Sequence, residues 1–254
     1  MKTFKLILLA TAALFITNCV QAQTADDIIN KYLNAIGGKE AIGKIKSLYM
    51  EFRESPAKGS IASSGNVNMI VGKGWRIEDN TGGKKIILCV TDSDGWMGSS
   101  IQGNAAQTIR TQALSNENYD YNKSKLEIDV PFGMPGAPFL DYAKNGFKVE
   151  LIGKEALDSI SVYNLKLTDK AGNETDFYID ANTFYLIKSV LHLSGSSVEM
   201  TTAYSAYRKT DIGYMMPFVR TMSMPVLDSG GVITTVTKMI INPEIDPKIF
   251  EQPE

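Results

Sequence analysis

The sequence predicts a mainly β (α+β) fold, a curved antiparallel sheet of about 11 strands with a few helices. Three observations predict it. From residue 47 onward, apolar residues recur with period 2. Short turns rich in Gly, Asn and Asp join the strands, whereas parallel sheets need helical crossovers. Several late strands are apolar on both faces, so the sheet needs a cover on each side.

The N-terminus has the pattern of an export signal. Lys2 and Lys5 precede the uncharged apolar run Leu6–Ile16. This run is shorter than the roughly 20 residues that span a membrane, and it has the length of a signal-peptide core. Val20–Ala22 then fits a small-x-small cleavage site. We therefore expect a signal peptide over 1–22 and a periplasmic mature protein.

One cysteine offers an alternative to cleavage. The residues that end in Cys19 resemble a loose bacterial lipobox, which would place a lipid on Cys19 and anchor the protein in the envelope. No later apolar run is long enough to span a membrane, so we expect no transmembrane segment in the mature chain. No composition shift divides the remainder, and we expect a single domain over 23–254.

The mature chain begins with a predicted helix over 26–36. Its apolar residues recur on one face at 3.6 residues per turn. Thr24 and Asp27 have the spacing of an N-terminal capping pair, and Gly37 and Gly38 supply the stop. Two shorter helices are expected over 39–45 and 138–144.

Period-2 patterns predict the strands in two groups, separated by a polar and proline-containing region over 99–138 that is expected to be loop or irregular helix. The first group is 47–54, 59–72, 74–79 and 84–91. The second group is 148–152, 159–169, 175–180, 185–193, 198–207, 214–224 and 231–241.

The late strands with two apolar faces suggest a hollow that holds an apolar ligand. One face of the sheet can pack against the first helix, and the other needs more protein or a ligand to cover it. A second protein layer formed by 99–145 is the alternative cover. Methionine adapts to irregular apolar shapes, which suits such a lining. The pattern does not fix which face is concave. The candidate ligand-binding residues are Met216, Phe218, Met222, Val236 and Ile240.

Residues for catalysis or metal binding are sparse. The only histidine, His192, lies in an apolar strand, and no Gly-x-Ser-x-Gly elbow accompanies it. Cys89 lies in a strand where it acts as a small apolar residue. Asp92 and Asp94 begin like a calcium loop, but the later acidic ligands are missing, which favours a hairpin turn. We expect no catalytic residue, metal or cofactor and no enzyme activity. The formal net charge of −2 argues against nucleic acid as a partner.

Two parts of the mature chain resemble exported outer-membrane lipoprotein-sorting proteins, the LolA/LolB-like family. The first part is the opening helix with its Gly-Gly stop and the start of the first strand. The second part covers several strand ends and turns of the C-terminal half. These segments are 25–38, 45–48, 177–180, 183–187, 213–217, 241–243 and 250–253.

The resemblance implies an unclosed barrel whose helices cover its open side and whose hollow holds lipoprotein acyl chains. It implies a periplasmic, non-enzymatic carrier of acyl chains or other lipids. It carries over no residue-level binding site to this chain. The alternative is a cell-envelope interaction module that docks a protein partner and has no lipid ligand.

Overall fold

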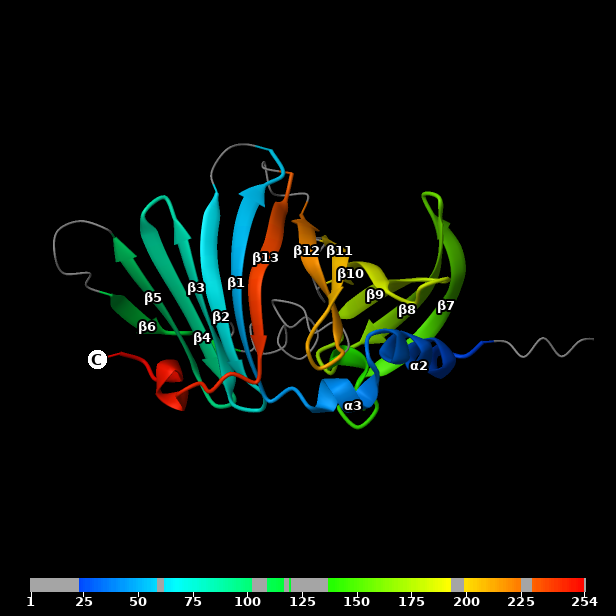
Figure 1. The fold of residues 1–254 in the computed structure, drawn as a ribbon, viewed down its shortest axis with the longest axis horizontal. Coiled ribbons are helices and arrows are strands. Elements are labelled where there is room, and N and C mark those ends of the chain that lie inside the picture. Colours follow the sequence, from blue (N-terminus) through cyan, green and yellow to red (C-terminus); the bar gives the residue numbers. More distant parts are fainter. Residues whose placement is uncertain are drawn as a thin grey trace, which may run out of the picture.

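The computed structural model describes residues 23–58, 62–101, 109–116, 119, 137–192, 199–224 and 230–253. The expected signal peptide, Cys19 and the prolines at 131 and 135 lie outside these residues. The described strands form one antiparallel sheet in the order β6-β5-β4-β3-β2-β1-β13-β12-β11-β10-β9-β8-β7 (Figure 1). The predicted curved antiparallel sheet is confirmed, with 13 strands in place of about 11.

The sheet has two flanks, each a meander of neighbouring strands. The N-terminal flank is β1 (Ser47–Pro56), β2 (Ser63–Ile70), β3 (Gly74–Thr81), β4 (Lys84–Thr91), β5 (Gly95–Ile101) and β6 (Arg110–Ala113). The C-terminal flank is β7 (Lys148–Leu157), β8 (Ile160–Thr168), β9 (Glu174–Asp180), β10 (Leu186–His192), β11 (Glu199–Lys209), β12 (Met215–Ser223) and β13 (Val232–Ile241). The first and last strands pair in the middle, so β6 and β7 are the two edges.

The two strands that sequence reasoning missed are β5 and β6. Their residues are rich in Gly, Ser and Gln, which are poor predictors of strands. They form because β4 offers a complete hydrogen-bonding edge, with Cys89 opposite Trp96. The expected helix over 138–144 is also wrong. The 3₁₀ turn η2 (Ala137–Phe139) stands at its start and irregular turns follow.

The first helix, α2 (Ala25–Ala35), has the predicted cap. The Asp27 backbone N–H donates to Thr24 Oγ1 at 3.2 Å, and the Thr24 N–H donates to Asp27 Oδ2 at 3.0 Å. This reciprocal pair satisfies donors that a helix start leaves open. The helix buries one face, as the periodicity predicted. The buried residues are Ile28, Ile29, Tyr32 and Leu33.

The second helix, α3 (Gly38–Gly43), follows a turn that requires glycine. Gly37 has φ +114°, and a Cβ there would lie 2.7 Å from the Gly213 carbonyl oxygen. The Met215 N–H donates to the Ile36 carbonyl at 2.9 Å. The end of α2 is therefore fixed against the start of β12. Among the described residues, no helix is long and apolar enough to cross a membrane.

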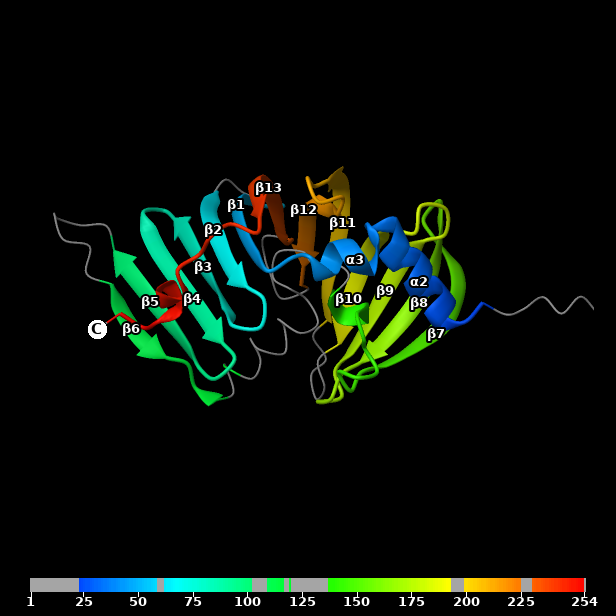
Figure 2. The same ribbon diagram turned by 60° about the horizontal axis from the view of Figure 1, so that its bottom comes forward.

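The sheet is arched, and its two faces differ (Figure 2). We call the face that shares the main core with α2 the inner face and the opposite one the outer face. The register places Leu48, Met50 and Phe52 of β1 on the inner face, and all three are buried in that core. The helices α2 and α3 and the C-terminal 3₁₀ turn η3 (Pro247–Phe250) lie at the same end of the strands (Figure 1).

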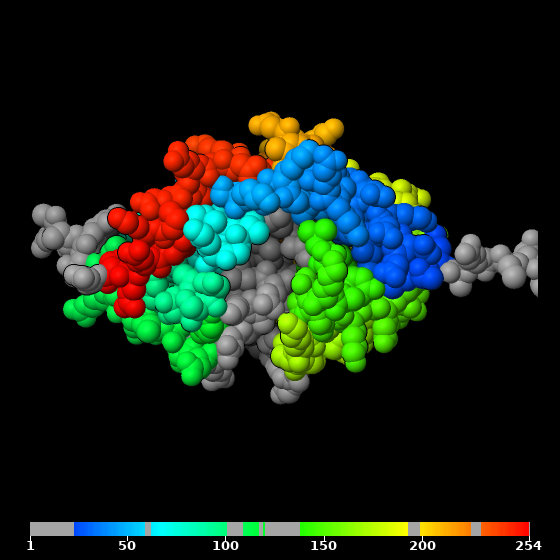
Figure 3. Space-filling model, turned by 90° about the horizontal axis from the view of Figure 1, so that it is seen from below, coloured from blue at the N-terminus to red at the C-terminus, as the bar shows by residue number. Residues whose placement is uncertain are grey.

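The C-terminal segment covers the outer face of the N-terminal flank. Seen from below, it lies outside the strands of that flank (Figure 3). Phe250 forms a second core with Ile87, Cys89 and Trp96, all of which are buried. The N-terminal flank therefore buries apolar side chains on both faces, although the two-sided apolar patterns in the sequence lie in late strands of the C-terminal flank.

Candidate functional site

The most open apolar surface of the described inner face lies on the N-terminal flank. Leu88 of β4 lies opposite Ile77 of β3 and Met97 of β5, so these side chains share one face. Met97 is 36% exposed and Ile86 is 37% exposed, while Ile77 and Leu88 are half-buried. We call Ile77, Ile86, Leu88 and Met97 the inner patch. Adjacent exposed apolar side chains on a curved face form a surface that a ligand can cover.

The inner patch lies between an apolar end and a polar end. Toward the helices, Trp75 lies opposite Met69 and Val90, and all three are buried. Toward the other end, Thr81 lies opposite Ser63 and Lys84. The inner face of this flank therefore changes from apolar to polar along the strands.

The inner face of the C-terminal flank is filled by the protein itself. Phe139 packs edge-on between Tyr32 of α2 and Phe177 of β9, with ring centroids 5.6 and 4.9 Å apart. Beneath them, Leu165 and Leu167 are fully buried. This flank is a packed core, so it offers a ligand less open apolar surface than the inner patch does.

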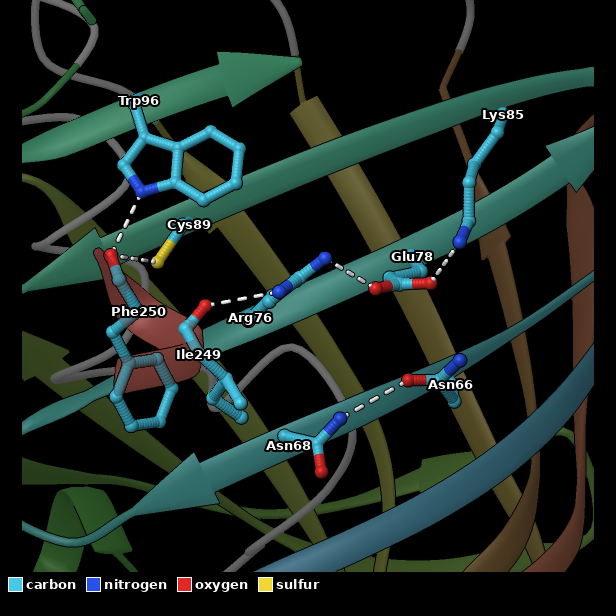
Figure 4. Close-up of polar contacts among 9 residues, drawn as sticks. All are labelled: Asn66, Asn68, Arg76, Glu78, Lys85, Cys89, Trp96, Ile249 and Phe250. Carbon is cyan, nitrogen blue, oxygen red and sulfur yellow. Dashed lines mark hydrogen bonds and ion pairs between the residues drawn. The ribbon is translucent and has the colours of Figure 1, made fainter. Parts of the chain in front are cut away.

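The outer face of the N-terminal flank is closed by specific polar contacts (Figure 4). The Trp96 indole donates to the Phe250 carbonyl at 2.8 Å, and the Cys89 thiol donates to the same oxygen at 3.3 Å. Arg76 donates to the Ile249 carbonyl at 3.0 Å and forms an ion pair with Glu78. These bonds satisfy buried polar groups and fix the C-terminal segment in place.

Two surface pockets lie on the outer side of this flank. One, of about 500 Å³, lies beside the β4–β5 turn and includes Lys73, Asp92 and Asp94. The other, of about 350 Å³, includes Glu51 and Arg53. Their charged linings suit polar ligands, because burying an unpaired charge against an acyl chain is costly.

Solved structures of other proteins share this architecture. The sequence matches no protein-family model and no curated protein. A LolA superfamily protein from Nitrosomonas europaea superposes with a TM-score of 0.55 at 15% identity, over 91% of this chain and 99% of that one. A putative outer membrane lipoprotein-sorting protein domain from Vibrio parahaemolyticus superposes with a TM-score of 0.53 at 11% identity, over 87% and 97%. The chain has a LolA-like fold.

A DUF1329 family protein from Desulfovibrio piger superposes with a TM-score of 0.58 at 13% identity, over 89% of this chain and 96% of that one. These likenesses cover nearly the whole length of each compared chain. At such identities they concern the LolA-like fold alone, and the chemistry of the site must come from this chain's own residues.

The structure brings four of the five predicted lining residues together within the LolA-like sheet. Met216 is 1% exposed and Val236 is 7% exposed, and both belong to the main core. Phe218 is half-buried, and the Arg208 guanidinium lies 4.5 Å from the centre of its ring. Met222 is half-buried on the same face of β12. Two of these side chains thus belong to the main core and Phe218 packs against it, whereas Met222 is half-buried outside it.

Ile240 is separated from the other four by a bulge. Val236 and Lys238 lie opposite consecutive residues of β1, so Thr237 is an extra residue in β13. One inserted residue reverses the alternation of side chains beyond it. Ile240 therefore lies on the outer face and is 42% exposed, while Met239 packs against the main core. Uninterrupted period-2 counting could not reveal this reversal.

The histidine and the described cysteine, which could carry chemistry, are held by ion pairs or by burial. His192 Nε2 lies 3.1 Å from Asp176, and its Nδ1 lies 3.3 Å from Glu199. This group belongs to the outer side of β9–β11, away from the inner patch. Burial raises the pKa of the Cys89 thiol to about 12, so the thiol stays protonated near neutral pH. No metal-binding group of three or more His, Cys, Asp or Glu occurs within the described ranges.

The acidic turn after β4 is the expected hairpin. The Thr91 N–H donates to the Asp94 carbonyl at 2.7 Å, and Thr91 Oγ1 donates to Asp94 Oδ1 at 2.6 Å. These bonds close the turn between β4 and β5.

Sequence reasoning missed the inner patch. Ile86 and Leu88 alternate along a predicted strand, which was a usable signal. Met97 lies in β5, which was not predicted, so no pattern placed it beside them.

Proposed function

We propose that this protein binds acyl chains of lipoproteins or of other lipids on the inner face of its sheet and acts as a non-enzymatic carrier. The observation that carries the proposal is the inner patch. A soluble domain seldom leaves adjacent large apolar side chains exposed on a curved face without a ligand or partner to cover them. The patch adjoins the buried Trp75 and Val90, so an apolar ligand would extend an existing core.

Burial of an acyl chain supplies enough free energy for such a role. Each buried CH₂ contributes about 0.8 kcal/mol. A sixteen-carbon chain would therefore gain on the order of 10 kcal/mol before the costs of ordering the chain and the protein are subtracted. No charged partner is needed for this contribution, in keeping with the apolar side chains of the patch.

The fold and the N-terminal sequence support the same role. A lipoprotein-sorting domain and a LolA superfamily protein share the architecture over most of their length. The apolar run at 6–16 has the pattern of an export signal. We therefore place the protein in the periplasm or at the envelope, where acyl chains need a carrier through water.

Matched charge insertions test the proposal. Met97→Asp places a carboxylate in the inner patch, and Ile240→Asp places one at similar exposure on the outer face. We expect Met97→Asp to weaken binding of a fluorescent sixteen-carbon fatty acid at least tenfold, because the chain would have to desolvate a charge. Ile240→Asp should leave the Kd within twofold, as measured by fluorescence titration.

Circular dichroism and a thermal melt of each variant would show that both remain folded. Binding that is equally strong in the wild type and in Met97→Asp would contradict the proposed site. A wild type that takes up no fatty acid or lipid would contradict the proposed function and favour a protein-docking module.

A further inference from the structure

The inner face of β2–β5 changes from apolar to polar along the strands, and this change would orient a bound ligand. Resting on the proposed function, we propose that an amphiphile lies along these strands with its acyl tail toward Trp75 and its head group beside Asp79 and Lys84. The head group this end fits carries both a hydrogen-bond donor and an anionic oxygen, as the head of a zwitterionic aminophospholipid does.

The polarity of the side chains changes step by step along the strands. The row nearest the helices is Met69, Trp75 and Val90, which are 7%, 2% and 0% exposed. The next row holds Ile77 and Leu88. Two residues further, Asp79 lies opposite Ile86, and the last row is Ser63, Thr81 and Lys84.

The distance along the strands suits an extended chain. From Trp75 to Thr81 the strand advances six residues, which is about 20 Å at roughly 3.3 Å per residue. An acyl chain laid along β3 would thus contact the apolar rows at Trp75 and Ile77 and then Ile86, which lies opposite Asp79. Its head would lie at the polar end, between the row of Asp79 and the row of Thr81.

The polar end offers one acceptor and one cation. The Thr81 hydroxyl donates to Asp79 Oδ2 at 3.0 Å, whereas the buried Asp79 Oδ1 has no hydrogen-bond partner among the described residues. Buried carboxylate oxygens normally have donors, so Oδ1 points to a donor from a ligand. Lys84 is exposed, whereas its neighbour Lys85 forms an ion pair with Glu78 on the outer face.

The opposite end cannot hold a charged head. The register places no charged side chain on the inner face of the row at Trp75. The Trp75 indole N–H has no partner among the described residues, but a single neutral donor does not compensate the burial of a charge. The charged head therefore belongs at the Lys84 end.

The two tryptophans of the chain make the orientation measurable. Trp75 lies at the apolar end of the inner face, and Trp96 lies on the outer face under Phe250. In Trp96→Phe, Trp75 is the only tryptophan, and bromine atoms quench a nearby indole. The ligand would be lysophosphatidylethanolamine with two bromines near the end of its acyl chain or near its head.

We expect bromines at the tail end to quench Trp75 at least twofold more strongly than bromines near the head. The complementary variant Trp75→Phe retains only Trp96, which should be quenched equally and weakly by both lipids. Binding of each lipid is checked separately by native mass spectrometry. Bound lipid with equal or reversed quenching of Trp75 would overturn the orientation alone. Absence of bound lipid would overturn the proposed function itself.

Two lysines at opposite ends of β3 allow a second test of the orientation. Lys84 begins β4 at the polar end, and Lys73 lies in the β2–β3 turn at the apolar end. Lys84→Gln should weaken binding of the phosphate-bearing lipid about two- to fivefold, the scale of an exposed ion pair. Lys73→Gln should leave it unchanged. A larger effect of Lys73→Gln would overturn the orientation, and monoacylglycerol, which has no phosphate, should bind both variants alike.

Discussion

The two flanks of the sheet cover their apolar faces in different ways. The C-terminal flank buries its inner face under α2 and Phe139, and its outer face carries His192 between two carboxylates. The N-terminal flank buries part of its outer face under the C-terminal segment. On its inner face, Met97 and Ile86 remain more than one-third exposed.

The difference shows which flank covers its inner apolar face and which leaves part of that face exposed. A face that the chain covers with its own side chains contributes to folding, because its apolar area is removed from water before any ligand arrives. A face left partly open gains this free energy only when a ligand or a partner covers it. The C-terminal flank is therefore the stable support, and the inner patch of the N-terminal flank is the surface available for a ligand.

The largest expected effect compares the same substitution in the two flanks. Leu165→Ala removes a fully buried side chain from the C-terminal flank and should lower the free energy of unfolding by about 2–5 kcal/mol. Leu88→Ala acts on a half-buried side chain of the inner patch and should cost about 1 kcal/mol. Urea unfolding followed by circular dichroism measures both, and equal losses would break the comparison.

The outer cover of the N-terminal flank should appear as an alkaline loss of stability. The Cys89 pKa is raised from 9.0 to about 12 by burial, so above pH 9 the unfolded chain releases this proton first. The contribution to stability is complete below about pH 9 and declines by about 1.4 kcal/mol per pH unit toward pH 12.

The variant Cys89→Ala isolates this contribution from that of other groups. Burial also raises the pKa of Tyr32 and Tyr214, and these act equally in both proteins. Urea unfolding between pH 8 and 11 should give a shallower decline for Cys89→Ala. Parallel declines, or fast reaction of the native thiol with a thiol reagent at pH 8, would show that Phe250 does not seal this face.

The smallest effect is expected on the outer face of the C-terminal flank. His192→Ala removes contacts to Asp176 and Glu199 from a side chain that is 35% exposed. Exposed ion pairs contribute little, so the free energy of unfolding should change by less than about 1 kcal/mol. The change should shrink further at 1 M salt. A loss as large as that of Leu165→Ala would mean that this face also belongs to the core.

Much of the fold could be predicted from local patterns. The Thr24–Asp27 cap, the Gly37 stop and eleven strands follow from side-chain chemistry within a few residues. The strands β5 and β6 could not be predicted in this way. Their polar residues form strands because neighbouring strands supply partners, and this is a tertiary effect.

The site was less predictable than the fold, for two physical reasons. The bulge at Thr237 moves Ile240 to the outer face, and nothing in the alternation of apolar residues marks it. The burial of Met216 and the exposure of Met97 depend on which flank the chain covers. Sequence patterns report that a strand is apolar on a face, whereas the arrangement of whole elements decides whether that face is core or site.

Native mass spectrometry tests the central claim most directly. The protein would be purified from the envelope of its own cells without detergent, and bound lipid would be extracted and identified. The account predicts co-purified acyl lipid at a defined stoichiometry, and Met97→Asp should lose this lipid while Ile240→Asp retains it. A wild-type protein with the mass of the polypeptide alone, together with no uptake of added fatty acid, would contradict it.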